Sequence, residues 1–522
     1  MTAEQDVMTR RSSGLAGGSA APRRMLVAYS MASTFTTTTL EYLEALKRCS
    51  GLEVDYLHVT HDAEIDFDIN RYDIVFHSYC ARLCFEDYVS ASYEAAMQRF
   101  LGLKMIAAQD EYDLTATLHR AIRRLGFHVY FTCVPKACWP MVHPESELPG
   151  VHLVQVLTGY VSESLDWKRC FAKPLASRSR KIAYRGRDIG ARYGQLGFDK
   201  FEIGRRMAEV CAAKGIPHDI AMDEASRIYG SRWFELVGDS RIMLGSESGS
   251  NAFDFDGTLR ELVAERERTL GRRVGYEEVA AAVAAFEAPF DIGQISPRVF
   301  ECAAMQTPMI MYRGSYSGAV EPDVHYIALE RDFSNIDAIL ARIDDLDWLQ
   351  GFADRAHQRL VASGDYSYES FVALVEATAR EQYARRIDPA YVAHRLRLQR
   401  PWQPSAVPAR PASLADANRM ALRERPSPVP LGKAEFLQRQ GELNKLRAIV
   451  HADEQARELV ASTKGLLKAL RRFVLSVVLL AGRFVHRALL PIWSRLPRDF
   501  RRSVGEPLRL LRNALSTQVR HG

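Results

Sequence analysis

Two charged segments in the second half of the chain combine residue types that bind phosphate groups. Tyr184-Arg185-Gly186-Arg187 carries two guanidinium groups, and Lys200 follows at the expected start of a helix. Arginine makes bidentate contacts with phosphate oxygens, while lysine acts as a point charge. Gly190, Gly194 and Gly197 would allow the backbone to approach a ligand closely. The segment predicts a diphosphate site; the alternative is a surface loop rich in arginine and glycine.

The second segment, Ser296-Pro297-Arg298-Val299-Phe300-Glu301, has the pattern of a helix N-terminus. Ser296 is expected as the N-cap and Pro297 as the first helical residue, which leaves backbone N–H groups for an anion. Glu301 lies one turn further on, where a carboxylate can accept hydrogen bonds from ribose or sugar hydroxyls. The alternative role for Glu301 is that of a solvated helix residue.

A third segment is acidic and resembles a different catalytic motif. Phe253-Asp254-Phe255-Asp256-Gly257-Thr258-Leu259 is similar to the nucleophile motif of haloacid-dehalogenase-type phosphatases, in which the first Asp attacks phosphorus beside Mg²⁺. That motif must follow an apolar strand, whereas Gly245–Ala252 is rich in Gly, Ser and Asn. We therefore expect Glu247, Asp254 and Asp256 to line a cleft as catalytic carboxylates, with turn formation as the alternative.

The elements that must position these residues alternate along the first part of the chain. Short apolar runs are separated by helical patterns, which is the signature of a parallel, doubly wound sheet. The expected strands are Met25–Ser30, Val54–Val59, Asp73–His77, Lys104–Gln109 and Phe127–Cys133, and the expected helices are Leu40–Leu46 and Ala116–Leu125.

The second part of the chain repeats this alternation. Its expected strands are Lys181–Tyr184, His218–Ala221, Ile242–Leu244 and Met309–Tyr312. Its expected helices are Phe201–Lys214, Arg232–Val237, Pro297–Met305, 336–346 and Phe371–Tyr383, with a helical insertion at Thr258–Glu287. The fold class is therefore α/β, with two Rossmann-like doubly wound domains that face a cleft.

Ligands of doubly wound sheets bind at the carboxyl ends of the strands. Asp110, Glu111 and Tyr112 directly follow an expected strand of the first domain, so we expect them to bind an acceptor. His77 ends another strand, but a hydrogen-bonded core histidine is the favoured interpretation there.

The segment around Glu301 resembles the donor-site helix of retaining GT-B glycosyltransferases. It looks closely like the bacterial "glycosyl transferases group 1" branch, in which a pattern similar to S-x-R-x-F-E-A-x-A precedes a strand. Members of this kind are associated with capsule, lipopolysaccharide or other surface-glycan assembly. The resemblance covers roughly residues 105–345, with landmarks at Gln109–Tyr112, Phe131–Pro135, Leu157–Val161, Tyr184–Arg187, Gly245–Gly249, Tyr316–Gly318 and His325–Tyr326.

The resemblance implies a nucleotide-sugar donor bound in the second domain. It implies that Glu301, the second Glu of the family's E-x7-E pattern, contacts the donor ribose. It also implies that Arg185 or Arg187, together with Lys200, holds the diphosphate. Tyr316 and His325 are expected in the same binding site.

The chain departs from the family pattern at two positions. The first Glu of E-x7-E would fall at Gly293, so that carboxylate is absent, and Asp291 lies two residues away. The glycine that usually follows the helix is replaced by Gln306.

A chain of 522 residues needs more than one hydrophobic core. The eight scattered cysteines are typical of reduced thiols in a cytosolic enzyme, and neither a metal site nor a cofactor is expected. The expected divisions are a disordered leader at 1–24, an acceptor domain at 25–165, a donor domain at 166–385, a Pro-rich linker at 386–432 and a helical tail at 433–522.

The C-terminal part of the chain is more basic than the rest. Residues 464–522 contain 13 Lys and Arg against Asp499 and Glu506, while the whole chain has a net charge of +5. The apolar run Phe473–Gly482 is about half the roughly 20 residues that a spanning helix needs. We expect an amphipathic helix on an anionic membrane surface, at the inner face of the plasma membrane, with a helical hairpin packed on protein as the alternative. Nucleic acid is not expected as a partner, because the rest of the chain is acidic.

Three functions remain open at this point. The favoured one is a cytoplasmic glycosyltransferase that moves a sugar from a nucleotide-diphosphate donor to a glycan or lipid-linked acceptor in cell-surface polysaccharide synthesis. The second is a Mg²⁺-dependent phosphatase that uses Asp254. The third is a non-catalytic GT-B-like scaffold at the membrane.

Overall fold

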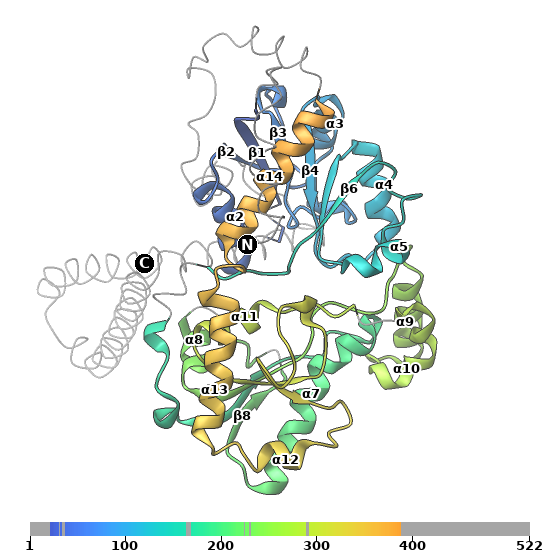
Figure 1. Ribbon diagram of the computed structural model, residues 1–522. Helices are drawn as coiled ribbons and strands as arrows, with labels where there is room; N and C mark the ends of the chain where they lie inside the picture. The colour runs from blue at the N-terminus through green and yellow to red at the C-terminus, as the bar shows by residue number, and fades with distance from the viewer. Residues whose placement is uncertain are drawn as a thin grey trace, which may run out of the picture. The chain divides into compact units, whose positions relative to one another are not determined.

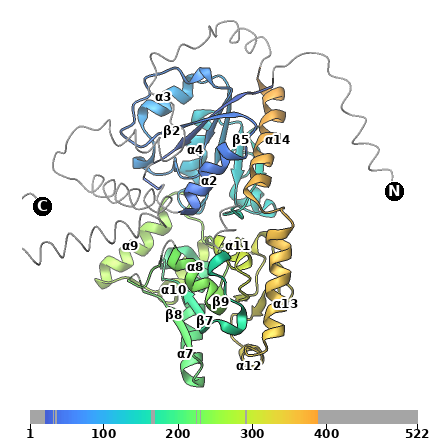
Figure 2. The same cartoon turned by 90° about the vertical axis from the view of Figure 1, so that its left-hand side faces the viewer.

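A computed structural model describes residues 21–30, 32–33, 37–162, 169–223, 225–228, 231–288 and 292–387 (Figures 1 and 2). By its contacts the chain divides into a unit of residues 1–448 and a unit of residues 449–522, and all described residues belong to the first. Residues 1–20 of the expected leader, nearly all of the linker and the whole tail lie outside the described residues. The expectations for them, including membrane binding by 464–522, stay predictions.

The first domain is built on a parallel sheet of six strands in the order β2-β1-β3-β4-β5-β6. The chain starts in β1 and adds β2 on one side and β3 on the other, which is the doubly wound topology expected from the alternating pattern. The strands are β1 (Arg24–Tyr29), β2 (Glu53–His58), β3 (Ile74–His77), β4 (Leu103–Ala107), β5 (Val129–Thr132) and β6 (His152–Gln155).

Strands of this sheet are apolar on both faces because helices cover both. Met25, Val27 and Tyr29 of β1 pack in one core with α2 (Thr37–Arg48) and α14 (Tyr368–Arg386). Leu26 and Ala28 point to the opposite side, where α3 (Ala91–Arg99) and α4 (Thr115–Leu125) complete a second core. Near-continuous apolar runs are typical of strands buried in this way.

The last described helix corrects one expected domain boundary. We placed Phe371–Tyr383 in the second domain, but Phe371, Val372, Val375 and Tyr383 of α14 are buried in the core of the first sheet. Figures 1 and 2 both show α14 beside the first domain. The sequence predicts a helix here but does not show which sheet the helix covers.

The chain therefore passes between the domains twice, and the two crossing segments lie together. Val161 and Ser367 form an isolated parallel bridge. The Val161 N–H donates to the carbonyl of Tyr366 at 2.7 Å, and the Tyr368 N–H donates to the carbonyl of Val161 at 3.1 Å.

The second domain holds a parallel sheet of five strands in the order β11-β10-β9-β7-β8. Its strands are β7 (Arg180–Arg185), β8 (His218–Ala221), β9 (Ser240–Gly245), β10 (Met309–Tyr312) and β11 (Ile327–Leu329). Side chains of α7 (Gly194–Lys214), α12 (Ile336–Leu340) and α13 (Leu346–His357) fill the core on one face, and those of α8 (Ser231–Gly238) and α11 (Pro297–Ala304) fill the core on the other. The fold class expected from the sequence is confirmed.

The helical insertion forms α9 (Thr258–Leu270) and α10 (Tyr276–Val283), which share a small core of their own. Two expectations in this domain were wrong in detail. Helix α7 begins at Gly194, so Lys200 lies in its second turn and does not open it. Asp344 and Asp345 lie at a helix start and not within a helix, because Asp345 caps α13 through the Trp348 N–H.

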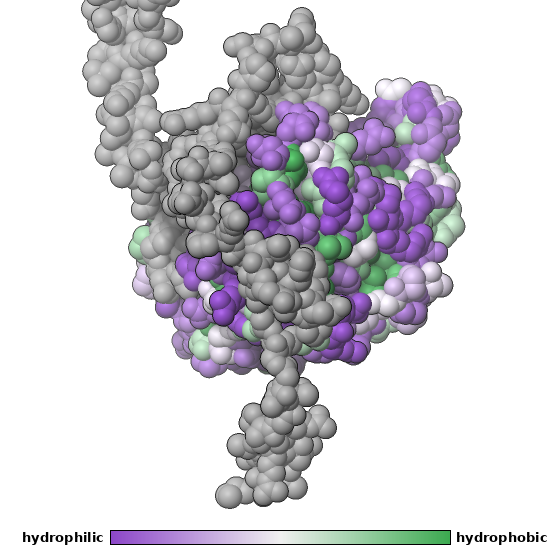
Figure 3. Space-filling view, turned by 90° about the horizontal axis from the view of Figure 1, so that it is seen from above, coloured by the Kyte–Doolittle hydropathy of each residue, from purple (hydrophilic) through white to green (hydrophobic). Residues whose placement is uncertain are grey.

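The surface of the described residues has few large apolar side chains. The most exposed is Leu101, at 60%. Figure 3 shows a face on which hydrophilic residues predominate and hydrophobic ones form small patches. Among the described residues, no helix has the length and apolarity that a bilayer crossing requires.

Candidate functional site

The second sheet reverses its strand order at β7, which pairs with β8 on one side and β9 on the other. Ligands of doubly wound sheets bind at the carboxyl ends of the strands next to such a reversal. Here those ends are Arg185 of β7 and Gly245 of β9, with Tyr312 of β10 beside them. The loops that follow these three residues carry most of the side chains expected in the site.

Three cations gather at this edge. The pKa of Lys200 is lowered to about 8, mainly by burial; the charge of Asp110 of the first domain opposes this, and the charges of Arg298 and Arg187 add to it. The Lys200 ammonium donates to the carbonyl of Gly249 at 3.5 Å. Concentrated positive charge in a partly buried place is unfavourable without an anion, so the group is suited to a ligand with phosphate oxygens.

Arg298 is held in place by its surroundings. Its guanidinium donates to the carbonyl of Arg185 at 2.6 Å and lies 4.7 Å from the ring centroid of Tyr184 and 5.3 Å from that of Trp233. Aromatic faces attract a cation of this kind. The charge of Arg298 is therefore fixed beside the loop that follows β7.

The two arginines of the first motif have different roles. Arg185 donates to the carboxylate of Asp219 at 2.6 Å and to the carbonyl of Asp219 at 2.8 Å, so it ties β7 to β8. Its expected contact with phosphate is not supported by this geometry. Arg187 is exposed, and its charge acts on the pKa of Lys200.

The helix of the second motif starts as expected. Ser296 is the N-cap of α11, and Pro297 is its first residue. The Ser296 hydroxyl accepts the Arg298 N–H at 3.3 Å, so this backbone donor is already used within the protein. Glu301 accepts the indole N–H of Trp233 at 2.8 Å, which orients its carboxylate, and the guanidinium of Arg298 lies 5.3 Å from the ring centroid of the same tryptophan.

The N-terminus of α7 does not offer its backbone to an anion. The Gln195 N–H donates to Glu287 at 2.8 Å, and the Leu196 N–H donates to Asn251 at 3.0 Å. A Cβ at Gly194 would overlap those same acceptors. We expected this glycine to admit a ligand, but it admits two side chains of the protein instead.

Glu247 is the most constrained carboxylate of the site. The residue is 1% exposed, and its Oε1 accepts the N–H groups of Ser315 at 2.8 Å and Tyr316 at 2.9 Å. Arg331 lies 3.7 Å from its Oε2. The loop after β9 is thereby joined to the loop after β10 and to Arg331, the second residue after β11.

The same carboxylate occupies the space beside two glycines. A Cβ built on Gly293 would overlap the carboxyl group of Glu247, and so would a Cβ built on Gly314. Neither glycine has the positive φ that would by itself favour glycine. Position 293, where the family pattern has a carboxylate, is thus filled by a carboxylate that comes from position 247.

The other two expected catalytic carboxylates have local structural roles. Asp254 is 2% exposed and accepts the N–H groups of Gly257, Leu259 and Arg260 at 2.9 to 3.1 Å, which caps α9. Asp256 is exposed and accepts the N–H of Thr258 at 3.0 Å. Turn formation, the alternative stated for these residues, explains both. No strand leads into Asp254, so the phosphatase motif lacks its structural context.

Tyr316 and His325 do not present their side chains to the cation group. The Tyr316 ring is buried, and its hydroxyl donates to the carbonyl of Tyr312 at 2.6 Å, so only its backbone N–H serves Glu247. His325 accepts the Glu321 N–H at 3.0 Å and borders a small hollow with Val299 and Tyr326. The hydroxyl of Tyr316 is therefore not available to a substrate, while the expected contact of His325 stays a prediction.

The first domain brings Asp110 to the carboxyl end of β4, as expected. Glu111, its neighbour, turns into the interior and is 3% exposed; burial raises its pKa to about 8. It accepts the Tyr130 hydroxyl at 2.9 Å, so it is not an acceptor ligand. His77 is a buried core residue within 3.0 Å of the Tyr93 hydroxyl.

Two residues that the structure places in the site were not predicted from the sequence. Trp233 orients Glu301, and Arg331 connects Glu247 at 3.7 Å with Asp199 at 2.8 Å. Neither residue belongs to a motif. Among the described residues, no group of three or more His, Cys, Asp and Glu could hold a metal ion, and every cysteine is a free thiol.

Neither a family model nor a curated relative matches the chain. The solved structures that match include glycosyltransferases of the GT-B fold. An alpha-glucosyltransferase with UDP and a 13-mer DNA is 11% identical over 69% of this chain and 100% of its own, with a TM-score of 0.42. Sucrose-phosphate synthase from Thermosynechococcus elongatus is 11% identical over 69% and 99%, with a TM-score of 0.37.

A T4 phage glucosyltransferase mutant with UDP-glucose is 11% identical over 69% of this chain and 99% of its own, with a TM-score of 0.39. Likenesses at this level concern the fold and carry nothing about donor, acceptor or residue roles. Some of these structures contain DNA, so the expectation that nucleic acid is not a partner finds no support in them.

Proposed function

We propose that the protein is a glycosyltransferase that uses a nucleotide-diphosphate sugar. The observation that carries the proposal is the group of Lys200, Arg187 and Arg298 at the strand-order reversal of the second sheet. Transfer of the sugar leaves a diphosphate whose negative charge grows as the glycosidic bond breaks. Fixed cations at the place where charge develops are an effective way to stabilise such a transition state.

Two carboxylates complete the donor site in this proposal. Glu301, oriented by Trp233, accepts hydrogen bonds from the donor ribose. Glu247 supports the sugar end of the site, because its carboxylate fills the position that the family pattern reserves for an acidic side chain at 293. The leaving diphosphate is held by side chains, and no metal ion is part of the proposal.

The proposal is less specific about the acceptor than about the donor. A glycan or lipid-linked acceptor in surface-polysaccharide assembly is what the sequence resemblance favours. Residues 464–522 would bring the enzyme to the anionic inner face of the plasma membrane, where a lipid-linked acceptor is available.

The test is a screen of nucleotide-sugars by thermal shift, followed by calorimetry. A ligand at 100 times its Kd adds about 2.7 kcal/mol of stability to the folded state. Replacing Lys200 with Met should weaken binding of the preferred nucleoside diphosphate at least about tenfold, because one charge-assisted contact is worth roughly 1.5 kcal/mol or more.

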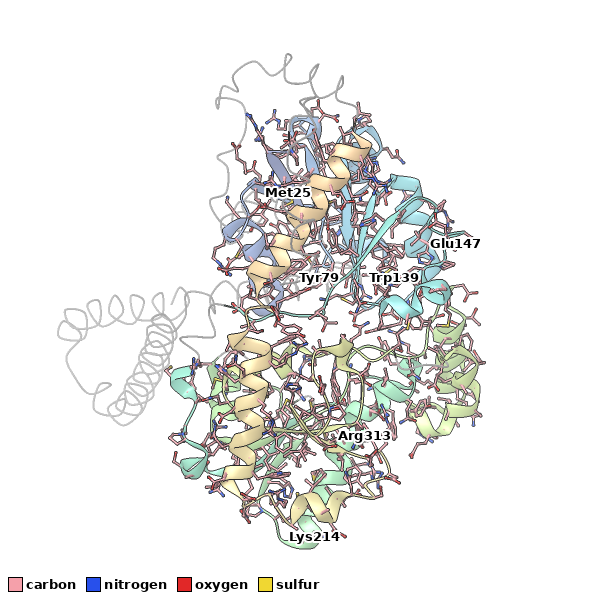
Figure 4. All side chains as sticks on the ribbon, viewed as in Figure 1. Met25, Tyr79, Trp139, Glu147, Lys214 and Arg313 are labelled. Atoms are coloured by element: carbon pink, nitrogen blue, oxygen red, sulfur yellow. The ribbon has the colours of Figure 1, made fainter. Side chains whose placement is uncertain are left out.

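The matched control is Lys214→Met on the same helix. Figure 4 shows Lys214 at the far end of α7, where it pairs with Asp337 at 2.8 Å. This variant should bind the nucleotide as the wild type does. A wild-type protein that binds no nucleotide-sugar at all contradicts the proposal. Donor binding without turnover of any acceptor would favour the non-catalytic scaffold.

A further inference from the structure

The acidic motif Phe253–Gly257 has no role in the donor site, yet its backbone joins the two domains. The Asp254 N–H donates to the carbonyl of Tyr112 at 2.8 Å. The Ala116 N–H donates to the carbonyl of Phe255 at 2.9 Å. Asp113 and Asp254 accordingly form an isolated parallel bridge. A short stretch of backbone pairing therefore connects the motif with the loop after β4 and the start of α4.

The motif is also anchored at both ends of the helical insertion. The Asp254 carboxylate caps α9, as described above, and so fixes the motif to the first turn of that helix. The Phe253 N–H donates to the carbonyl of Phe286 at 2.9 Å, which lies just after α10. Since α9 and α10 share one core, the motif and the insertion form one packed unit of the second domain.

Ion pairs reinforce the backbone contacts. Asp113 of the first domain has a side chain that is only 5% exposed. Its carboxylate lies 2.5 Å from the guanidinium of Arg192 and 3.6 Å from that of Arg260, and both arginines belong to the second domain. Arg82 of its own domain lies 3.4 Å away. Separation of the domains would break two of the three ion pairs of a buried carboxylate, which is unfavourable.

An apolar cluster closes the same junction. It has six buried members, three from each domain: Val134, Cys138 and Val142 of the first, and Leu196, Phe253 and Ile292 of the second. Opening the junction would expose these side chains to water, which the hydrophobic effect opposes. Leu196 lies in the first turn of α7, the helix that carries Lys200. The junction therefore fixes this helix to the first domain.

The junction and the two chain crossings lie on opposite faces of the first sheet. Tyr368 and Phe371, which follow the second crossing, pack in the core that contains α2. Leu118 and Ile122 of α4, whose first turn pairs with the motif, pack in the core on the other face. Rotation of the domains about the crossings would have to break the junction, because the two attachments are separated by the sheet.

We propose that the motif Phe253–Gly257, together with Asp113 and Arg192, is a latch that holds the two domains in one arrangement without a ligand. The latch gives the acidic motif a role that neither phosphatase chemistry nor donor binding provides. Lys200 is then in place relative to the first domain before any ligand arrives. Preorganisation of this kind favours binding, because the ligand does not have to bring the domains together.

The experiment measures the distance between two spin labels on either side of the latch, in the full chain and without nucleotide. The labels replace Met141 of α5 (Trp139–Val142) and Glu277 of α10, which are both exposed. They are attached through a genetically encoded ketone side chain, because the chain contains eight cysteines that could react with thiol reagents. Double electron–electron resonance should give one narrow distance distribution for the otherwise wild-type protein.

Ala116→Pro removes the N–H that donates to Phe255 and places a ring carbon against that carbonyl. Residue 116 is the second of α4, and proline is tolerated in the first turn of a helix. The distribution should broaden, and its maximum should move to a longer distance by more than about 2 Å. Ala91→Pro, at the first residue of α3, is the matched control and should leave the distance unchanged.

Asp113→Asn weakens the ion pairs without altering a helix, and it decides the question if Ala116→Pro does not fold. It should lengthen the distance in the same way and speed amide exchange in residues 253–257 about threefold or more. The control is Asp239→Asn, because Asp239 also pairs with two cations, Lys173 at 2.7 Å and Arg180 at 2.6 Å, but both lie in its own domain. This control should change neither quantity.

Three outcomes would overturn the latch. They are a broad or two-peaked distribution in the wild-type protein, latch variants that keep the wild-type distance, and controls that lengthen the distance as much as the latch variants do. No nucleotide takes part in these measurements, so a failure of the latch is distinct from a failure of the proposed function.

Discussion

The carboxylate of Glu247 occupies the space that a side chain on residue 293 would require. The two residues belong to different loops, and an antiparallel bridge between Ser248 and Gln294 holds those loops together. Gly293 therefore lacks a side chain for a reason other than backbone conformation. Position 293 has no acidic side chain because the carboxylate of Glu247 already occupies that space.

Gly293→Ala should reduce stability. The added methyl group would overlap a carboxylate that is bonded to Ser315 and Tyr316, and overpacking of this kind costs about 1–3 kcal/mol. Urea denaturation gives the change. Gly51→Ala is the control, because its nearest neighbour atom would lie 3.6 Å from the new Cβ. Equal effects of the two substitutions would contradict the assignment of the space at 293 to Glu247.

A glutamate introduced at position 293 should restore the binding of the nucleotide-sugar that is lost when Glu247 is replaced. Glu247→Gly should weaken binding of the nucleotide-sugar more than binding of the nucleoside diphosphate alone, because the sugar end of the site loses its support. The double variant Glu247→Gly with Gly293→Glu should recover that difference at least in part. Calorimetry with both ligands measures it. No recovery, with the fold intact by circular dichroism, would show that the position of the carboxylate is not interchangeable.

Nucleoside diphosphate binding should weaken as the pH rises above about 8. The folded protein holds the pKa of Lys200 near 8, below the usual 10.5, so the ammonium that a phosphate needs is lost above that pH. The affinity should fall about fivefold to tenfold between pH 7.5 and 9. Without ligand the sign is opposite: between pH 8 and 10.5 the unfolded chain binds more protons, and stability rises with pH. Calorimetry on Lys200→Arg should show a flat profile.

Glu111→Gln should stabilise the protein at pH 9 and have little effect at pH 5. Burial raises the pKa of Glu111 from 4.5 to about 8, so the folded state binds more protons than the unfolded state between these values, and its stability falls as the pH rises through them. The amide preserves an acceptor for the Tyr130 hydroxyl. Denaturation at the two pH values checks this, and a gain that is equal at both would contradict it.

Gln306→Gly should raise the stability by about 0.5–1 kcal/mol. Gln306 follows α11 with φ +48°, a conformation that costs an L-residue roughly 1–2 kcal/mol and glycine almost nothing. Arg178 bonds to the backbone carbonyl of residue 306, and that contact survives the change. Gln306→Ala keeps the strain and should bring no gain. The midpoint of urea denaturation distinguishes the two variants.

Much of the fold could be predicted because its signals are local. The strand Met309–Tyr312 was placed to the residue, and β1 and α2 were found with small shifts at their ends. The elements α3, α13, β6 and the three-residue β11 were not predicted, because their patterns are short or mixed. The packing of α14 on the first sheet could not be foreseen, since periodicity shows a buried face but not its partner.

Some features of the candidate site could likewise be predicted from the sequence, and others could not. The N-cap at Ser296 follows from residue types and spacing alone, and the structure confirms it. The pairing of Arg185 with Asp219 depends on residues that the fold brings together, so the motif alone assigned Arg185 to a ligand. The capping of α9 by Asp254 is local, and turn formation was the alternative stated for that residue. Glu247 and Gly293 are 46 positions apart, so the reason for a glycine at 293 becomes apparent only in the structure.

The return of α14 to the first sheet has a practical consequence for dividing the protein. A fragment that stops at residue 165 would lack Phe371, Val375 and Tyr383 and would expose the apolar face that they cover. The smallest piece with a closed first core is discontinuous and joins residues 21–162 to 366–387. Because Val161 and Ser367 already lie side by side, a short artificial loop between the two crossing segments would suffice to express the first domain on its own.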